Sequence, residues 1–165
     1  RALRSLHAHQ PAIVHGDLKP PNIMVERVGG RGQGTKPRAK LLDFGLSRAL
    51  ERSPRHLGGT RGWTAPEVAL HGEPAPSADV FSFGCVVHYV MTRRALAPDH
   101  LPTDTCPDIP PWPVSLPTFR CWSTTRWCLQ FDPGARPSMK EVQDGLFAGE
   151  LESEEGGGAR DTASL

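Results

Sequence analysis

The sequence predicts an α+β fold that is mainly helical, with short strands near its beginning and helices later. Three short runs of apolar, β-prone residues lie among polar segments in the first 42 residues, which indicates short strands. Later segments repeat apolar residues with the period of an α-helix. The length of 165 residues and the hydrophobic share of 38% are those of one ordinary globular domain.

The expected elements, in chain order, are the end of a helix at 1–9, strands at 13–14, 23–25 and 39–42, and helices at 77–91, 118–131 and 138–148. The first helix has its leucines on one face and is stopped by Pro11. The first two strands bracket the polar segment 15–22, which is typical of a functional loop. The helix at 77–91 is apolar nearly all round, with Ser77 as its expected N-cap, so we expect it in the middle of the core.

The connecting segments differ in composition. Residues 26–38 are rich in Gly, Arg and Lys and predict a mobile connector. Residues 46–64 show no periodicity and predict a long loop, and seven prolines at 98–117 exclude regular structure there. The last residues are acidic and rich in Gly and Ser, so we expect one domain at 1–148 and a disordered acidic tail at 149–165.

Charge is unevenly distributed along the chain. Residues 1–61 carry 12 Lys or Arg against 4 Asp or Glu, whereas residues 62–165 carry 7 against 14. A basic half can attract phosphate groups, although charges in a connector can equally serve only to keep it solvated. No aromatic residues are interleaved with the basic ones at 27–40, so we expect no nucleic-acid partner. The densest apolar run, 85–91, is too short for a membrane span.

The cysteines are expected to be reduced and buried. They are Cys85, Cys106, Cys121 and Cys128, with no CxxC pair and no regular spacing. This pattern fits a reducing compartment, and no signal-peptide pattern is present, so we expect a cytoplasmic protein. The one close pair of metal-binding side chains, His7 and His9, is not enough to predict a zinc site.

The strongest chemical signal lies in the polar segment 15–22 and in two strings after it. The segment reads HGDLKPPN, with Asp17, a Lys two residues later and an Asn five residues later. DFG follows at 43–45 and APE at 65–67. In this order, and in these strand and loop settings, the motifs resemble those of the protein kinase superfamily. The strings DVFSFG at 79–84 and DPGARP at 132–137 extend the resemblance over nearly the whole chain.

The resemblance implies the mainly α-helical C-terminal lobe of a protein kinase, with short β-hairpin strands carrying the catalytic and metal-binding loops. Asp17 would accept the proton of the substrate hydroxyl, and Lys19 would neutralise charge on the phosphoryl group transferred from ATP. Asn22 and Asp43 would be oxygen ligands of Mg²⁺, and together with Lys19 they would bind the nucleotide. Gly45 would give the turn after Asp43 its backbone freedom. Singly, each residue could be a turn former or a solvated charge; their occurrence together favours the chemical roles.

Further residues are expected to hold the fold, namely His15, Glu67, Asp79 and Arg136. The resemblance implies that Glu67 pairs with Arg136, which would tie the segment after DFG to the helical lobe. It also implies that Asp79 accepts backbone N–H bonds from the loop at 15–22.

The string GTRGWTAPE at 59–67, together with Lys19, resembles the serine/threonine-specific branch of the family. The resemblance implies that Thr60 contacts Asp17 and Lys19 and so belongs with the catalytic residues; a plain loop Thr is the alternative. The same string and the helix at 85–91 also resemble the tyrosine-kinase-like group and the kinase domain of the unfolded-protein-response sensor.

The sequence departs from the family in two ways. Gly16 stands where the family has an Arg that pairs with a phosphate, so we expect activity that needs no phosphate at Ser53, Thr60 or Thr64. The chain also shows no Gly-rich phosphate loop and no strand Lys with a partner Glu, and it begins without Met. We therefore expect an excerpt in which the N-terminal lobe is absent, with an apolar surface left exposed and no phosphate transfer by this chain alone.

Two functions follow from these residues. The first is an ATP- and Mg²⁺-dependent protein serine/threonine kinase, which transfers the γ-phosphate to a Ser or Thr hydroxyl of a protein substrate. The second is a catalytically inactive pseudokinase that serves as a protein-binding scaffold. The presence of all four candidate catalytic and metal-binding residues favours the enzyme, whereas Gly16 and the Pro-rich segment 98–117 favour the scaffold.

Overall fold

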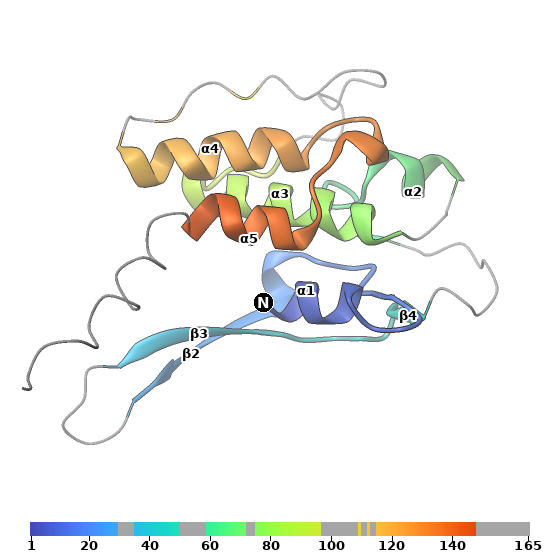
Figure 1. Cartoon of the computed structure of the whole chain (residues 1–165), viewed down its shortest axis with the longest axis horizontal. Helices are drawn as coiled ribbons and strands as arrows, with labels where there is room; N and C mark the ends of the chain where they lie inside the picture. The colour runs from blue at the N-terminus through green and yellow to red at the C-terminus, as the bar shows by residue number, and fades with distance from the viewer. Residues whose placement is uncertain are drawn as a thin grey trace, which may run out of the picture.

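The computed structural model describes residues 1–29, 35–49, 59–71, 75–96, 109, 112 and 115–147. They form a helical body with two small antiparallel sheets, each of two strands, on one side of it (Figure 1). The elements, in chain order, are α1 (Ala2–His7), β1 (Ile13–Val14), η1 (Pro20–Asn22), β2 (Ile23–Val28), β3 (Lys36–Leu41), β4 (Arg48–Ala49), α2 (Pro66–His71), α3 (Pro76–Thr92), α4 (Leu116–Cys128), η3 (Pro133–Ala135) and α5 (Met139–Phe147). This is the mainly helical α+β arrangement that the sequence predicts.

The core is built around α3, as its apolar composition predicts. One buried cluster joins Phe81 of α3 to Leu129, which follows α4, and to Val68 of α2. A second cluster joins Val80 of α3 to Leu3 of α1 and Val142 of α5. Because α3 contributes to both clusters, it lies between the other helices, and removing these side chains from water stabilises the body that carries the loops.

The backbones of α3 and α4 come close together at Gly84. A Cβ atom placed on Gly84 would lie 2.9 Å from the Cβ of Cys128 and 2.9 Å from the Cγ of Leu129. Only glycine leaves room for this approach, because it has no side chain to separate the two helices.

The β2–β3 hairpin is longer than the sequence predicts. Its two strands pair from Ile23↔Leu41 to Val28↔Lys36, so that 26–28 and 36–38 are strand rather than the expected mobile connector. The pattern did not indicate this extension because residues 35–40 are exposed, and a strand with no buried face needs no apolar alternation. Likewise, β4 pairs with β1 inside the segment that was expected to be a loop throughout.

The helix boundaries also differ from the expected ones. The N-cap of α3 is Ala75 and the helix begins at Pro76, so Ser77 lies inside the first turn and is not the cap. Helix α4 begins at Leu116 and includes a proline in its first turn, where no hydrogen bond is lost; the side chain of Ser115 caps it. The short helix α2 was not expected. The acidic tail and most of the Pro-rich segment lie outside the described residues.

The cysteines follow the sequence prediction where they can be placed. Cys85 and Cys128 are free and buried, and Cys121 is free and half-buried, whereas Cys106 lies outside the described residues. Burial raises the pKa of the Cys128 thiol to about 12 and also raises that of Cys85. In the described part of the chain, no helix has the length and apolar character needed to cross a bilayer.

Candidate active site

The loop at 15–22 follows β1 and is hydrogen-bonded to a side chain of α3, Asp79. Both carboxylate oxygens of Asp79 accept backbone hydrogen bonds from it, Oδ2 from the His15 N–H at 2.8 Å and Oδ1 from the Gly16 N–H at 3.0 Å. Asp79 is almost fully buried, so these bonds replace the water that its charge would otherwise bind. The expected contact of Asp79 with the loop is therefore present. Gly16 has a φ of 80°, in the left-handed region that favours glycine.

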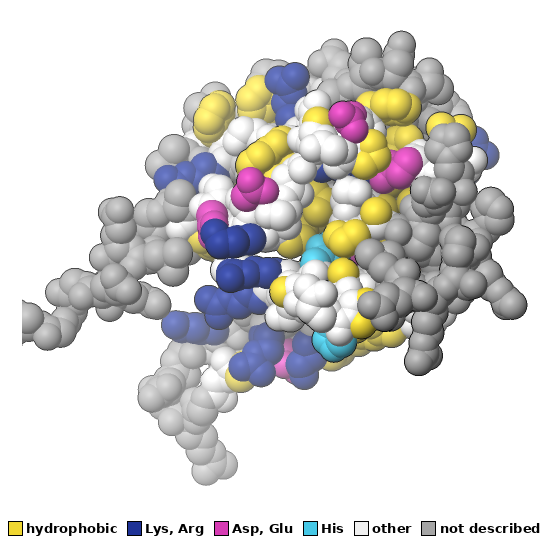
Figure 2. Space-filling view, turned by 45° about the vertical axis from the view of Figure 1, so that its right-hand side comes forward, with side chains coloured by type: hydrophobic (Ala, Val, Ile, Leu, Met, Phe, Trp, Pro, Cys, Tyr) yellow, Lys and Arg dark blue, Asp and Glu magenta, His cyan; other side chains and the backbone are white. Residues whose placement is uncertain are grey.

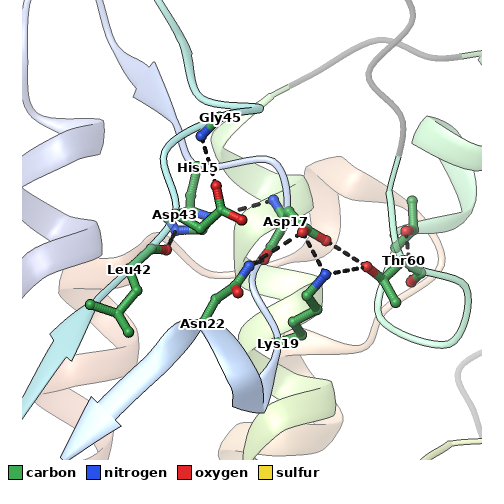
Figure 3. A network of polar contacts seen from close by, with 9 residues as sticks. His15, Asp17, Lys19, Asn22, Leu42, Asp43, Gly45 and Thr60 are labelled. Carbon is green, nitrogen blue, oxygen red and sulfur yellow. Dashed lines mark hydrogen bonds and ion pairs between the residues drawn. The ribbon is translucent and has the colours of Figure 1, made fainter.

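His15 joins the loop to the segment that follows β3. Its side chain is fully buried, and its Nε2 lies 3.1 Å from the backbone oxygen of Leu42 (Figure 3). The Ser47 hydroxyl donates to the His15 backbone oxygen at 3.1 Å, and the ring of Phe44 lies 5.2 Å from the imidazole. His15 thus positions the segment that carries Asp43, which agrees with its expected structural role.

Three side chains of the candidate site form a closed triangle of hydrogen bonds (Figure 3). The Lys19 ammonium donates to Asp17 Oδ2 at 2.7 Å and to the Thr60 hydroxyl at 2.7 Å. The Thr60 hydroxyl in turn donates to Asp17 Oδ1 at 2.8 Å. The expected contacts of Thr60 with Asp17 and Lys19 are both present, across about 40 residues of sequence. Its catalytic role stays a prediction.

The surroundings of Asp17 keep its carboxyl group ionised. Partial burial raises the pKa of this group, but hydrogen bonds from Lys19 and Thr60, the Lys19 charge and a bond from Asn22 lower it by more. The net result is a pKa below the ordinary value for an aspartate. At neutral pH, Asp17 is therefore a carboxylate that can accept a proton or a hydrogen bond.

Asn22 and Asp43 stand at the base of the β2–β3 hairpin. The Asn22 side-chain amide donates through Nδ2 to the Asp17 backbone oxygen at 2.8 Å and to Asp17 Oδ2 at 3.2 Å, which leaves its Oδ1 as a possible ligand. The Leu42 N–H donates to the Asn22 backbone oxygen at 2.8 Å. This bond closes the hairpin and brings the residue before Asp43 beside Asn22.

The backbone freedom at the DFG string belongs to a different residue than expected. Asp43 has a φ of 58°, whereas Gly45 is not in the left-handed region. Asp43 Oδ1 accepts the Gly45 N–H at 3.1 Å, and a Cβ on Gly45 would lie only 3.0 Å from that oxygen. Gly45 is therefore needed for space next to the carboxylate, and Asp43 itself makes the turn.

The donor set at the hairpin base fits Mg²⁺. An amide oxygen from Asn22 and an exposed carboxylate from Asp43 are the hard oxygen ligands that this ion prefers. Mg²⁺ usually takes one or two protein ligands and completes its coordination with water and phosphate oxygens. No group of three or more His, Cys, Asp or Glu side chains suited to a metal occurs among the residues that the structure describes.

A buried ion pair attaches α2, the helix after the Thr60 segment, to the end of the body. Arg136 Nη1 donates to Glu67 Oε1 at 2.6 Å and Nη2 to Oε2 at 2.8 Å, as predicted. The Arg136 side chain is completely buried, and the Glu67 side chain is 18% exposed. A bidentate pair of this kind fixes the angle of α2 as well as its position.

Two contacts at the site were not anticipated. His7 of α1 places Nε2 2.9 Å from Asp79 Oδ2, and the Ser82 hydroxyl of α3 donates to the Trp63 backbone oxygen at 2.6 Å. In the sequence, His7 stands out only as one of a close pair of metal-binding side chains. Its position on the inward side of an amphipathic helix was a signal for a buried polar contact.

Several large apolar side chains on and beside the hairpin are exposed. They include Val25, which is 64% exposed, and Phe44, which is 50% exposed. Both lie on the stretch of chain that also carries the candidate metal ligands.

Comparison with known proteins agrees with this geometry. A family model described as protein kinase domain matches residues 1–147. The chain is 38% identical over 94 residues to the serine/threonine-protein kinase/endoribonuclease IRE1 of Oryza sativa subsp. japonica, a match that covers 53% of this chain and 10% of that protein. It is 33% identical over 151 residues to mitogen-activated protein kinase kinase kinase 7 of Homo sapiens, which covers 83% of this chain and 23% of that protein. The chain thus spans about a quarter or less of the length of these relatives, and it belongs to the protein kinase family.

Proposed function

We propose that this chain is the catalytic-loop half of a protein serine/threonine kinase, which transfers the γ-phosphate of ATP to a Ser or Thr hydroxyl of a protein substrate. The observation that carries the proposal is the triangle of Asp17, Lys19 and Thr60, in which every bond is between 2.7 and 2.8 Å. The names of the relatives, both of which are called protein kinases, support the same reaction class.

Each residue has a defined part in this proposal. Asp17, ionised at neutral pH, accepts the proton of the substrate hydroxyl, and Thr60 holds its carboxylate in one orientation. Lys19 places a positive charge beside Asp17, where negative charge develops on the transferred group. Asn22 and Asp43 would hold Mg²⁺. When bound, Mg²⁺ with ATP supplies the phosphoryl group and neutralises part of its charge.

The scaffold alternative is less well supported. A pseudokinase that only binds a partner has no chemical need for an aspartate whose pKa is lowered by a lysine and a threonine. It also has no need for an amide and a carboxylate at the ends of one hairpin. We further propose a cytoplasmic location, because Cys85, Cys121 and Cys128 are free thiols.

The test is a phosphotransfer assay with the complete protein that contains this chain, carrying Asp17→Asn. We expect kcat to fall at least about 100-fold, the usual contribution of a general base. Asp144→Asn is the matched control, because Asp144 is exposed on α5 and forms an ion pair with Lys140 on the same helix. An Asp17→Asn protein that keeps the kcat of the control would exclude the proposal.

A further inference from the structure

One face of the β2–β3 hairpin is strongly basic. Lys36, Arg38 and Lys40 alternate along β3, so their side chains lie on the same face. Lys40 bonds Glu26 at 2.9 Å, whereas Lys36 and Arg38 have no acidic partner among the described residues. All three are exposed. Figure 2 shows Lys and Arg side chains gathered on this side of the molecule.

The outer edge of β3 is open next to these charges. The Leu42 N–H points toward β2, where it donates to Asn22, so the N–H groups of Lys40 and Arg38 also point inward. The N–H groups of Ala39 and Leu41 therefore point outward, and no second strand pairs with β3 in the part of the chain that the structure describes. Pro37 occupies the next position whose backbone N–H would point away from β2, but proline has no N–H. The part of the edge that can donate hydrogen bonds is therefore short.

A segment of this same chain matches the edge in both charge and period. Residues 150–155 read ELESEE, so Glu150, Glu152 and Glu154 alternate as the basic residues of β3 do. In extended conformation these glutamates share one face, and Leu151 lies on the other. The corresponding other face of the hairpin carries exposed apolar groups, including Val25. At the edge of β2, by contrast, the glutamates would meet Glu26, which has the same charge.

We propose that the acidic segment 150–155 binds in extended form along the outer edge of β3, with its glutamates facing Lys36, Arg38 and Lys40. The segment begins three residues after Phe147, the end of α5. That end of α5 and the Val28–Lys36 end of the hairpin lie on the same side of the molecule in Figure 1. Because the segment is tethered, its effective concentration is high, and a few exposed ion pairs are enough to populate the bound form.

Binding at this edge would act on the element that joins the candidate metal ligands. Asn22 directly precedes β2, and one residue, Leu42, separates the end of β3 from Asp43. An acidic segment on β3 therefore competes with any other anionic partner for the approach to this hairpin. This inference does not depend on the proposed phosphate transfer, because the charge pattern and the open edge exist whether or not the chain is catalytic.

The experiment measures amide hydrogen exchange in residues 36–41 of the full 165-residue chain. Replacing Glu150, Glu152 and Glu154 together by Gln should speed exchange there on the order of fivefold, and Arg38→Glu should have the same effect. Arg27→Glu is the matched control, because this substitution changes the charge by the same amount as Arg38→Glu but on the opposite face of the same hairpin. We expect it to leave the exchange rates unchanged.

A charge exchange makes the test specific. Combining Arg38→Glu with Glu152→Lys should restore slow exchange, and raising the salt concentration from about 0.05 M to about 0.5 M should abolish the protection in the unmodified chain. The proposal is overturned if the triple Gln variant exchanges like the unmodified chain, or if Arg27→Glu acts like Arg38→Glu. It is equally overturned if the edge is protected only after a single-stranded RNA is added, because the face would then serve a nucleic acid.

Discussion

Removing Arg136 should destabilise the whole fold, because this side chain holds two parts of the chain together. Its guanidinium binds both oxygens of Glu67 and also donates to the backbone oxygens of Ser77, Gln130 and Phe131 at 2.7 to 3.0 Å. The Arg136→Ala variant loses all five bonds at once and leaves the Glu67 carboxylate without its partner.

The size of the effect follows from burial. Removing one partner of a buried ion pair costs roughly 3–5 kcal/mol of unfolding free energy. Arg136 is completely buried, but Glu67 is 18% exposed, so water can reach the orphaned carboxylate and the lower end of that range applies. For a domain of this length, about 3 kcal/mol corresponds to a fall in Tm of roughly 6–12 °C.

The assay is thermal unfolding followed by circular dichroism, with Lys140→Ala as the control. Lys140 makes an exposed ion pair with Asp144 on the surface of α5, so its loss should cost less than about 1 kcal/mol. Arg136→Lys should fall in between, because an ammonium cannot reproduce the forked contacts of a guanidinium. If Arg136→Ala lowers the Tm no more than Lys140→Ala does, the reasoning about the buried pair is wrong.

Three other predictions concern packing, pH and regulation. Gly84→Ala should lower the free energy of unfolding, measured by urea denaturation, by about 1–3 kcal/mol because it overpacks the core, whereas Gly145→Ala, with its nearest contact at 3.7 Å, should not lower it. Because the pKa of Asp17 is lowered in the folded chain, its ionised carboxylate stabilises the fold above about pH 4, and this stabilisation is lost as the pH falls further. The difference in unfolding free energy between the unmodified chain and Asp17→Asn should therefore shrink between pH 7 and pH 3. A difference that stays constant over this range would contradict the prediction. Because Gly16 offers no cation to a phosphate, phosphatase treatment of the complete protein should leave kcat unchanged, and a loss of about tenfold or more would contradict the expectation.

The sequence was most informative where the relevant residues are close together in the chain. Asp17, Lys19 and Asn22 lie within six residues, between two short strands, so their appearance on one loop followed from local pattern. The helix that contains Gly84 could be placed in the core because it is apolar nearly all round. The pairing of Glu67 with Arg136, 69 residues away, was implied by the resemblance to the family and could not be predicted from periodicity.

What the sequence did not predict has three physical causes. The polar stretch Lys36–Leu41 forms a strand because its partner supplies the hydrogen bonds, and an exposed ladder leaves no hydrophobic pattern to detect. The contact of His7 with Asp79 joins residues 72 positions apart, so the helix pattern could indicate a buried polar contact for His7 but could not identify Asp79 as its partner. The sequence predicts backbone freedom at Gly45 because propensity alone favours glycine in a turn, whereas the residue with a left-handed φ is Asp43.

The carboxylate of Asp79 has a consequence for how this protein assembles. It accepts backbone hydrogen bonds from His15 and Gly16, which precede it by 64 and 63 positions, and it contacts the side chain of His7, which precedes it by 72 positions. The loop that carries Asp17 therefore takes its final shape only when α3 is docked against it, and contacts of such long range are slow to form because the intervening chain must be ordered. A nascent or partly unfolded chain would present the catalytic-loop residues without their geometry. Any chemistry at this loop would consequently switch on and off with the cooperative folding of the whole helical body.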